Sequence, residues 1–415
     1  MEDKGFWKSG HWPTLLIALL YFDFCFAIWV LNGAMSPFIS EQFGLTPAQK
    51  GFMISVPIIS GALLRFPLGV LAQYIGRKWA ALVEMGTIVC GLLYGFFFAD
   101  TYNEVLIMGV MLGIAGASFG VALSLGGGWY PPKYKGLAIG IAGAGNSGAI
   151  IAVLFGPMIA IKYGWQSVYG FAVILMAIPM FLMFFFAKEP PDREKKTLGG
   201  YLKVLVEKDA WIFNISYILT FGGYIGFTNF LPTLFHDQFG ISKSQMGQYA
   251  AVIIIMASVS RVIGGYIADR FGGLNVMVVI CGFVALTAIA ASTMPSAVVM
   301  TLIMIILFFG LGAGNGSTFQ LVPHRWPGNT AIAMSLIGEI GAIGGSLIPN
   351  AMGLSKQYFG TFRYGFLLWT VIAGGIFIMY IVIYRKWTTT WVGAGGRALS
   401  PEEREKRKSQ GVLSV

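Results

Sequence analysis

The sequence predicts an all-α membrane protein with twelve transmembrane helices arranged as two pseudo-symmetric six-helix halves. Three observations lead to this fold class. The chain of 415 residues is 56% hydrophobic and only 11% charged, whereas a soluble protein carries about twice that charged fraction. Long apolar segments recur along the chain, and the second half repeats features of the first at one fixed spacing. A soluble globular fold is therefore excluded.

Each apolar segment is close to the ~20 residues that a helix needs to cross ~30 Å of hydrocarbon. Glycine is abundant, at 56 residues, which suits membrane helices that pack backbone to backbone. We predict spans at residues 13–36, 50–73, 79–98, 105–128, 136–160, 167–187, 211–235, 246–268, 274–294, 297–322, 329–352 and 363–384.

The longest polar stretch lies between the sixth and seventh spans and divides the chain. We predict an N-terminal half at 1–187, a cytoplasmic linker at 188–210, a C-terminal half at 211–390 and a cytoplasmic tail at 391–415. The tail contains "RALSPEEREKRKSQ", whose high charge predicts that it is partly disordered.

Lysine and arginine are distributed unevenly between the two sets of loops. If the N-terminus is inside, 21 of the 28 basic residues lie in cytoplasmic segments and 5 in outer ones. This bias predicts a multi-pass protein of a cell inner membrane with both termini cytoplasmic. The first span has no small-residue cleavage site close behind it, so we expect it to be retained as a helix.

The two halves align at a shift of 196 residues (261 minus 65). "RFPLGVLAQYIGRK" begins at Arg65 and "RVIGGYIADRFGG" at Arg261, and the same shift brings Tyr21 onto Tyr217. Since six is even, both halves have the same topology. Parallel six-helix repeats with a binding site at mid-membrane are the architecture of the major facilitator superfamily.

Arg65 and Arg261 lie well inside apolar spans. A charge at mid-bilayer costs at least ~2.5–3.5 kcal/mol, so such residues are expected to face the protein interior and to have a function. We expect the two to converge on a central cavity and to bind a small planar oxyanion, because guanidinium donates two parallel hydrogen bonds. The structural alternative is that each pairs with a buried carboxylate, Glu84 or Glu339.

Two glycine-rich segments lack the bulk of ordinary core helices. "GLAIGIAGAGNSGAI" contains Gly145 and Asn146, and "GEIGAIGGSLIPNAMG" contains Gly341 and Gly344. Close helix packing and contact with substrate are both compatible with this spacing. The Asn146 amide could donate to an anion, and Phe119, in "GIAGASF", could line the cavity or be an ordinary packing aromatic.

Other classes of function find no support in the sequence. The net charge of +10 is concentrated in short loops at helix ends rather than in a nucleic-acid-binding patch, so we expect no nucleic acid partner. The 3 cysteines and 3 histidines have no metal-ligand spacing, and no catalytic set is visible. We therefore expect no metal, no cofactor and no enzyme activity.

Four segments together resemble the nitrate/nitrite porter family of the major facilitator superfamily, and most of all bacterial assimilatory nitrate transporters. They are "YFDFCFAIWVLNGA", "VPIISGALLRFPLG", "GLAIGIAGAGNSG" and "GAIGGSLIP". The resemblance covers nearly the whole chain. It departs from the superfamily pattern at Gln73, where an acid is usual, whereas Asp269 is kept in the second half. The residues that the resemblance implies for substrate binding are Arg65, Arg261, Asn146, Tyr217, Phe119, Phe221, Gly145, Gly341 and Gly344.

The resemblance implies a secondary active transporter of nitrate, with nitrite as a further substrate, that works by alternating access in the lipid bilayer. We expect proton-coupled uptake, with Asp23 as the first candidate for the proton carrier and Glu84 and Glu339 after it. A monomer would suffice. The alternatives are nitrate/nitrite exchange, transport of another small anion such as formate, and, outside transport, a nitrate-sensing membrane receptor.

Overall fold

The computed structural model describes residues 5–191, 203–326, 330–397, 399 and 401–410. In these residues 12 helical segments are long and apolar enough to cross a membrane, which confirms the predicted all-α membrane fold. The segments are Trp12–Phe43, Pro47–Ile75, Arg77–Phe98, Tyr102–Gly127, Tyr134–Tyr163, Trp165–Phe186, Lys208–Phe239, Met246–Phe271, Gly273–Ser292, Ala297–Arg325, Ile332–Phe359 and Arg363–Thr389.

Several spans are built from more than one helix. In the first part of the chain the elements are η1 (Phe6–Lys8), α1 (Trp12–Trp29), α2 (Leu31–Phe43), α3 (Pro47–Ile75), α4 (Arg77–Phe98), α5 (Tyr102–Gly113), η2 (Ile114–Ala117), α6 (Ser118–Gly127), α7 (Pro132–Ala142), η3 (Gly143–Gly148), α8 (Ala149–Tyr163) and α9 (Trp165–Phe186).

The second part continues in the same way. Its elements are α11 (Lys208–Tyr217), η4 (Ile218–Gly222), α12 (Gly223–Phe239), α13 (Met246–Phe271), α14 (Gly273–Ser292), α15 (Ala297–Arg325), α16 (Thr330–Gly345), α17 (Leu347–Phe359), α18 (Arg363–Thr389), η5 (Ala394–Gly396) and α19 (Pro401–Ser409). The tail, expected to be partly disordered, thus contains the helix α19.

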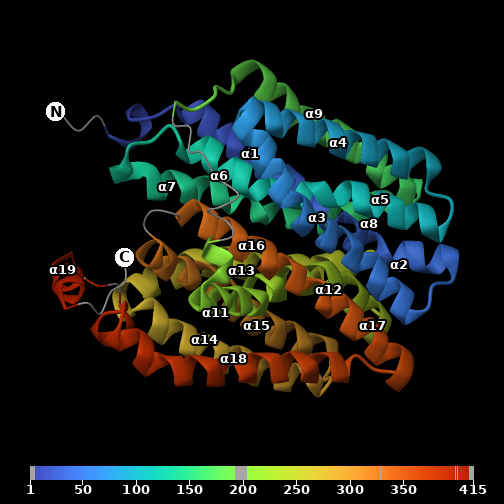
Figure 1. The fold of residues 1–415 in the computed structure, drawn as a ribbon. Coiled ribbons are helices and arrows are strands. Elements are labelled where there is room, and N and C mark those ends of the chain that lie inside the picture. Colours follow the sequence, from blue (N-terminus) through green and yellow to red (C-terminus); the bar gives the residue numbers. More distant parts are fainter. Residues whose placement is uncertain (1–4, 192–202, 327–329, 398, 400, 411–415) are drawn as a thin grey trace. The chain divides into compact units, whose positions relative to one another are not determined.

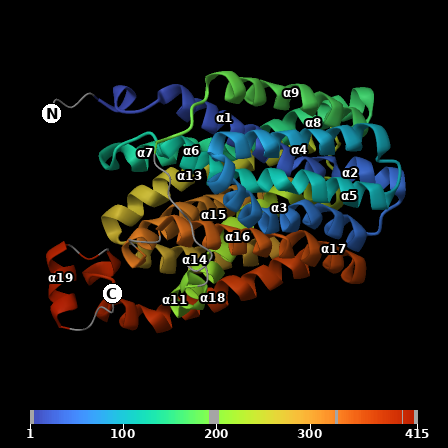
Figure 2. The ribbon, with the colours of Figure 1, turned by 45° about the horizontal axis from the view of Figure 1, so that its top comes forward.

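The chain forms two compact units. The first comprises residues 1–196 and 225–254, and the second comprises 197–224 and 255–415. In the first unit α4 lies along α9 (Figure 1), and α8 lies beside α9 (Figure 2). In the second unit α14 packs along α18, which also contacts α17 (Figures 1 and 2). The predicted division into six-helix halves at 188–210 stays a prediction.

The repeat is visible in the backbone conformation. Three pairs of glycines related by the shift of 196 have positive φ, the left-handed region in which a Cβ is strained. Since each pair ends a helix or begins the next at equivalent points, the two parts of the chain break their helices in the same register. The pairs are Gly44 and Gly240 (φ 59° and 65°), Gly76 and Gly272 (93° and 91°), and Gly164 and Gly360 (84° and 71°).

The start of α4 explains how the first unit compensates for Gln73. The Glu189 carboxylate accepts the backbone N–H groups of Arg77 and Lys78, each at 2.9 Å. An acid at a helix N-terminus satisfies unpaired N–H groups and the helix dipole. At the equivalent start of α14, by contrast, the carbonyl of Gly395 lies against Gly272. In the first unit the anionic cap of α4 therefore comes from Glu189, which lies just after the end of α9.

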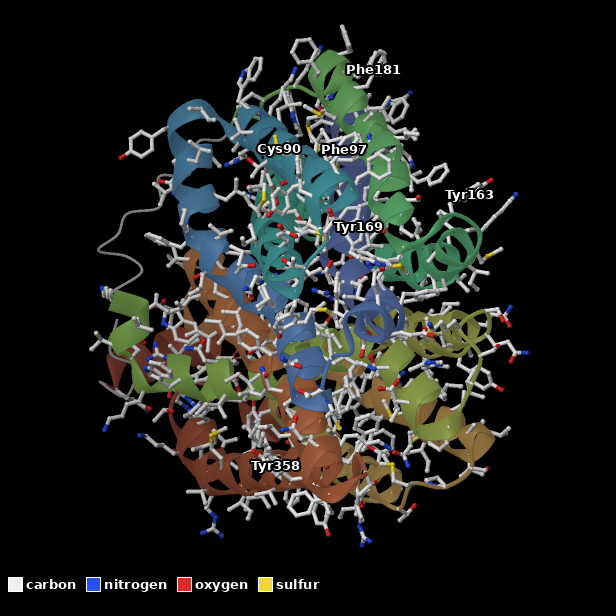
Figure 3. All side chains as sticks on the ribbon, turned by 90° about the vertical axis from the view of Figure 1, so that its right-hand side faces the viewer. Cys90, Phe97, Tyr163, Tyr169, Phe181 and Tyr358 are labelled. Atoms are coloured by element: carbon white, nitrogen blue, oxygen red, sulfur yellow. The ribbon has the colours of Figure 1, made fainter. Side chains whose placement is uncertain are left out.

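The outer faces of the helices are apolar, as a lipid-facing surface requires. Phe97 and Phe181 are 62% and 56% exposed, whereas Tyr169 is completely buried and donates to the Asn32 side chain at 2.8 Å. Figure 3 shows Phe181 on the outer side of its helix and Tyr169 among the helices of the first unit. Tyr358, in the second unit, is 72% exposed (Figure 3). Hydrophobic side chains thus cover both the inside and the outside of the units.

Candidate functional site

Three short segments inside the spans depart from α-helical geometry, and all lie in or next to the predicted binding segments. η2 and η3 are 3₁₀ helices, and η4 is a π-helix. η3 contains Gly145 and Asn146, η2 ends two residues before Phe119, and η4 contains Phe221. Irregular turns within long helices frequently mark functional sites. The local backbone therefore points to the segments that the sequence singled out.

Arg65 is held in the first unit by a backbone carbonyl and two aromatic rings. It is 6% exposed, and its Nε donates to the Gly116 carbonyl at 2.8 Å. Its guanidinium carbon lies 5.6 Å from the ring centroids of both Trp29 and Phe119. Such cation–π contacts orient a guanidinium without neutralising it. Phe119, predicted as a substrate-binding residue, thus lies near Arg65, and Trp29 is a contact that the sequence analysis missed.

Glu84 lies in the same region as Arg65. It is completely buried, and its Oε2 accepts a hydrogen bond from the Tyr21 hydroxyl. The positive charge of Arg65 acts on this carboxyl group. The structural alternative, in which a buried acid compensates the arginine, therefore has a basis in the first unit. Tyr21 could have been found from the repeat, because it is the counterpart of Tyr217.

Asp23 faces the glycine-rich segment rather than Glu84. Its carboxylate accepts the Ser147 hydroxyl at 2.7 Å and the backbone N–H of Gly148. A Cβ on Gly148 would collide with the Asp23 backbone carbonyl, and one on Gly145 would lie 2.7 Å from the Asp23 nitrogen. Both glycines are thus needed for close packing of η3 on α1. This supports the packing interpretation, and contact of Gly145 with substrate stays a prediction.

Asn146 lies between these two glycines in η3. Its side chain is 2% exposed, so it is directed into the protein rather than toward lipid. A buried amide in a membrane helix is expected to have a polar partner or a ligand. Its predicted contact with the anion remains a prediction.

The second unit gathers aromatic side chains around Tyr217. The Tyr217 ring stacks on Phe221 with centroids 5.2 Å apart, and Phe319 lies 4.9 Å from it. Arg261 lies ten residues before the end of α13, at Phe271, as Arg65 lies ten before the end of α3 at Ile75. At 1.5 Å per residue both arginines lie about 15 Å from a helix end, which is near mid-membrane depth.

The glycines of α16 pack on the same aromatic segment. A Cβ on Gly341 would lie 2.6 Å from the Tyr217 ring, and one on Gly344 would meet the Ile218 side chain. Glu339 is 9% exposed and accepts the Ser335 hydroxyl at 3.1 Å. The structure thus brings Arg65 together with Phe119, and Tyr217 with Phe221. Convergence of the two arginines stays a prediction, because they belong to different units.

A polar cluster that the sequence analysis did not anticipate lies in the first unit, at the ends of α2, α3 and α12. Lys50 Nζ lies 2.6 Å from an Asp237 carboxylate oxygen, and Lys243 pairs with Glu41. The Ser36 and Thr233 hydroxyls are hydrogen-bonded at 2.6 Å.

The four charged residues of this cluster line a cavity of about 600 Å³. Partial burial lowers the pKa of Lys243 from its ordinary value, because desolvation disfavours the charged form. No local sequence signal links Lys50 to Asp237, which is 187 residues away.

The sequence profile of the Major Facilitator Superfamily matches residues 17–349. The chain belongs to this superfamily. A solved structure shows the same fold, that of a D-xylose–proton symporter, with a TM-score of 0.75 at 14% identity, covering 94% of this chain and 99% of the symporter. At this identity the likeness concerns the fold alone.

Three relatives have names that refer to nitrate or nitrite. The nitrite extrusion protein of Bacillus subtilis (strain 168) is 28% identical, covering 86% of this chain and 91% of the relative. The probable nitrate/nitrite antiporter NarK1 of Thermus thermophilus is 26% identical, covering 90% and 91%. The probable nitrate transporter NarT of Staphylococcus haemolyticus (strain JCSC1435) is 28% identical, covering 91% and 98%. The predicted resemblance to nitrate/nitrite porters is thereby confirmed.

Proposed function

We propose that this chain is a secondary active transporter of nitrate, with nitrite as a further substrate, that works by alternating access. The observation that carries the proposal is Arg65, a buried guanidinium oriented by two aromatic rings within a membrane span. Its counterpart Arg261 occupies the same register of α13. The names of the three relatives supply the anion.

A planar oxyanion fits this site chemically. Guanidinium N–H groups can donate two parallel hydrogen bonds to one anion, and the aromatic faces exclude water from it. In the proposed cycle Arg65 and Arg261 bind the anion together, and Asn146, Tyr217 and Phe221 contribute to its pocket. With the anion bound, the paired cationic charge is reduced and the site can close.

The orientation in the membrane is part of the proposal. With both termini cytoplasmic, the cluster around Lys50 and Asp237 lies at the extracytoplasmic end of the first unit. Its ion pairs hold α12 against α2 and α3, and would have to break for this end to open. We propose that the Lys50–Asp237 and Lys243–Glu41 pairs act as an outer latch of the transport cycle.

Coupling to protons is the second part of the proposal. Entry of an anion into a negative cell costs ~2.3 kcal/mol per charge per 100 mV, so uptake needs a proton or a counter-anion. Asp23, Glu84 and Glu339 are the candidate proton carriers. The main alternative, nitrate/nitrite exchange, is favoured by the relatives named for nitrite extrusion and for nitrate/nitrite antiport.

Reconstitution into liposomes tests the function. Nitrate uptake is measured under three conditions: with an imposed pH gradient, with nitrite inside, and with neither. Proton coupling predicts accumulation with the pH gradient alone, whereas an exchanger requires internal nitrite. Preference for formate over nitrate in competition would overturn the substrate. Nitrate binding without movement under any condition would indicate a receptor instead of a transporter.

A further inference from the structure

Glu84 is the buried acid of the first unit that anion binding by itself does not explain. It lies seven residues after Arg77, the first residue of α4, which corresponds to about 10 Å from that end of the helix. Its side chain is 0% exposed. Burying an ionised carboxylate in a membrane protein is costly unless a cation or a proton compensates it.

The groups around Glu84 leave one of its oxygens available for a proton. Oε2 accepts the Tyr21 hydroxyl, and Oε1 is buried with no hydrogen-bond partner in the described part of the chain. Arg65 on α3 is the cation whose charge acts on the carboxyl group. The Cys25 thiol on α1 also interacts with Glu84 electrostatically.

The other helices packed on α4 bring no further charge to Glu84. The sequences of η2 and α6 contain no titratable residue. The titratable group of α9 is Tyr169, which packs against Gly95, about 16 Å along α4 from Glu84. Glu104 of α5 accepts the backbone N–H of Asp100 at an exposed helix start. Arg65 is thus the cation that acts on Glu84, whose carboxyl group is also desolvated by burial and hydrogen-bonded to Tyr21.

We propose that Glu84 is the proton-binding residue of the transport cycle and that Arg65 couples its proton to the anion. The inference rests on the proposed function and assigns the coupling residue of that same site. In the empty site Arg65 compensates the Glu84 carboxylate. When an anion binds to Arg65, the positive charge of Arg65 is divided between the anion and the Glu84 carboxylate. Glu84 therefore takes up a proton on Oε1. Release of the anion returns Arg65 to Glu84, and the proton leaves.

One proton then accompanies each anion, and the pair crosses the membrane without net charge. The membrane potential therefore does not oppose uptake through this step, and the pH gradient drives it. Asp23 fits the role less well, because its carboxylate already accepts the Ser147 hydroxyl and the Gly148 N–H. These two hydrogen bonds fasten η3 to α1.

The test measures protons taken up on nitrate binding by the purified full-length protein. Calorimetric titrations with nitrate are repeated in two buffers of different ionisation enthalpy, which gives the proton number directly. Wild-type protein and the control Glu104→Gln are expected to take up about one proton per nitrate, and Glu84→Gln none. In liposomes Glu84→Gln is expected to lose pH-driven accumulation at least about tenfold, while nitrate/nitrite counterflow falls less than about threefold.

Tyr21→Phe provides a second variant if Glu84→Gln folds poorly. It removes only the hydroxyl on Oε2, so the pH of half-maximal uptake should shift while the proton number stays near one. A normal proton number in Glu84→Gln, or its loss in Asp23→Asn alone, would overturn the inference. Wild-type nitrate transport without proton uptake would overturn it while leaving the nitrate transporter intact. Absence of nitrate transport altogether would reject the proposed function itself.

Discussion

Arg65 and Arg261 occupy the same register of repeated helices, but two buried-span acids of the first unit are not repeated at the equivalent positions of the second. At the shift of 196 residues, the buried acid Glu84 corresponds to Ile280 and Asp23 corresponds to Leu219. In the first unit the positive charge of Arg65 acts on Glu84, and in the second unit aromatic rings gather around Tyr217. The repeat thus has an arginine at both positions but an acid at only one of the two positions equivalent to Glu84.

This difference suggests a division of labour between the repeats. We propose that both arginines bind the anion and that Arg65 exchanges charge with Glu84. Glu339, the candidate acid of the second unit, corresponds to Gly143 in the first, so it is not part of the repeated pattern. Substitutions at matched positions of the two halves can show whether their roles are equal or different.

The largest effect is expected from lysine at either arginine. Arg65→Lys and Arg261→Lys keep the charge but lose the planar pair of donors, each worth about 1.5–3 kcal/mol for a charged partner. We expect nitrate affinity to fall roughly 10- to 100-fold in both variants. Calorimetric binding of nitrate to the purified variants, with circular dichroism as the folding control, measures this. Normal uptake by either variant would remove the central assignment.

A matched pair of glycine substitutions compares the contact of η3 with α1 and the contact of α16 with η4. The Cβ of Gly148→Ala would collide with the Asp23 backbone carbonyl, which cannot move aside, whereas that of Gly344→Ala meets a side chain, Ile218. Overpacking of this kind costs about 1–3 kcal/mol. We expect Gly148→Ala to lower both thermal stability in detergent and uptake more than Gly344→Ala does. Equal losses would mean that both contacts adapt in the same way.

The outer latch can be tested by exchanging its charges. Lys50→Asp should leave two acids face to face and favour opening of this end, because the pair is only partly exposed, with side-chain exposures of 9% and 22%. Adding Asp237→Lys restores an opposite-charge pair. We expect uptake to fall several-fold in the single variant and to recover in the double variant. Labelling of a cysteine introduced at Ser40, which lines the cavity, reports the opening.

The smallest effect is expected at Phe119, whose counterpart in the repeat is Asn315. Phe119→Leu removes one of the two rings that orient Arg65, a contact worth about 0.5–2 kcal/mol. We therefore expect the KM for nitrate to rise about 2- to 30-fold, with the proton number per nitrate unchanged. A changed proton number would show that Phe119 also governs the charge on Glu84.

The structure also bears on interpretations that the sequence left open. Gly145 and Gly148 could have served packing or substrate, and their contacts with the Asp23 backbone support packing. Gln73 stands where an acid is usual in the superfamily, and Glu189 supplies an acid at the start of α4. In both cases the partner comes from another helix, so neighbouring residues in the sequence could not reveal it.

The sequence by itself determined the twelve spans, the repeat at 196 residues and the depth of the two arginines. These features follow from hydropathy, chain length and helical rise, which can be obtained from the order of residues along the chain. Only the tertiary structure decided that Tyr21 meets Glu84, that Trp29 covers Arg65 and that Lys50 pairs with Asp237. Such contacts depend on the rotation of each helix about its axis, which is set by packing against its neighbours. In uniformly apolar spans no periodic pattern records that rotation.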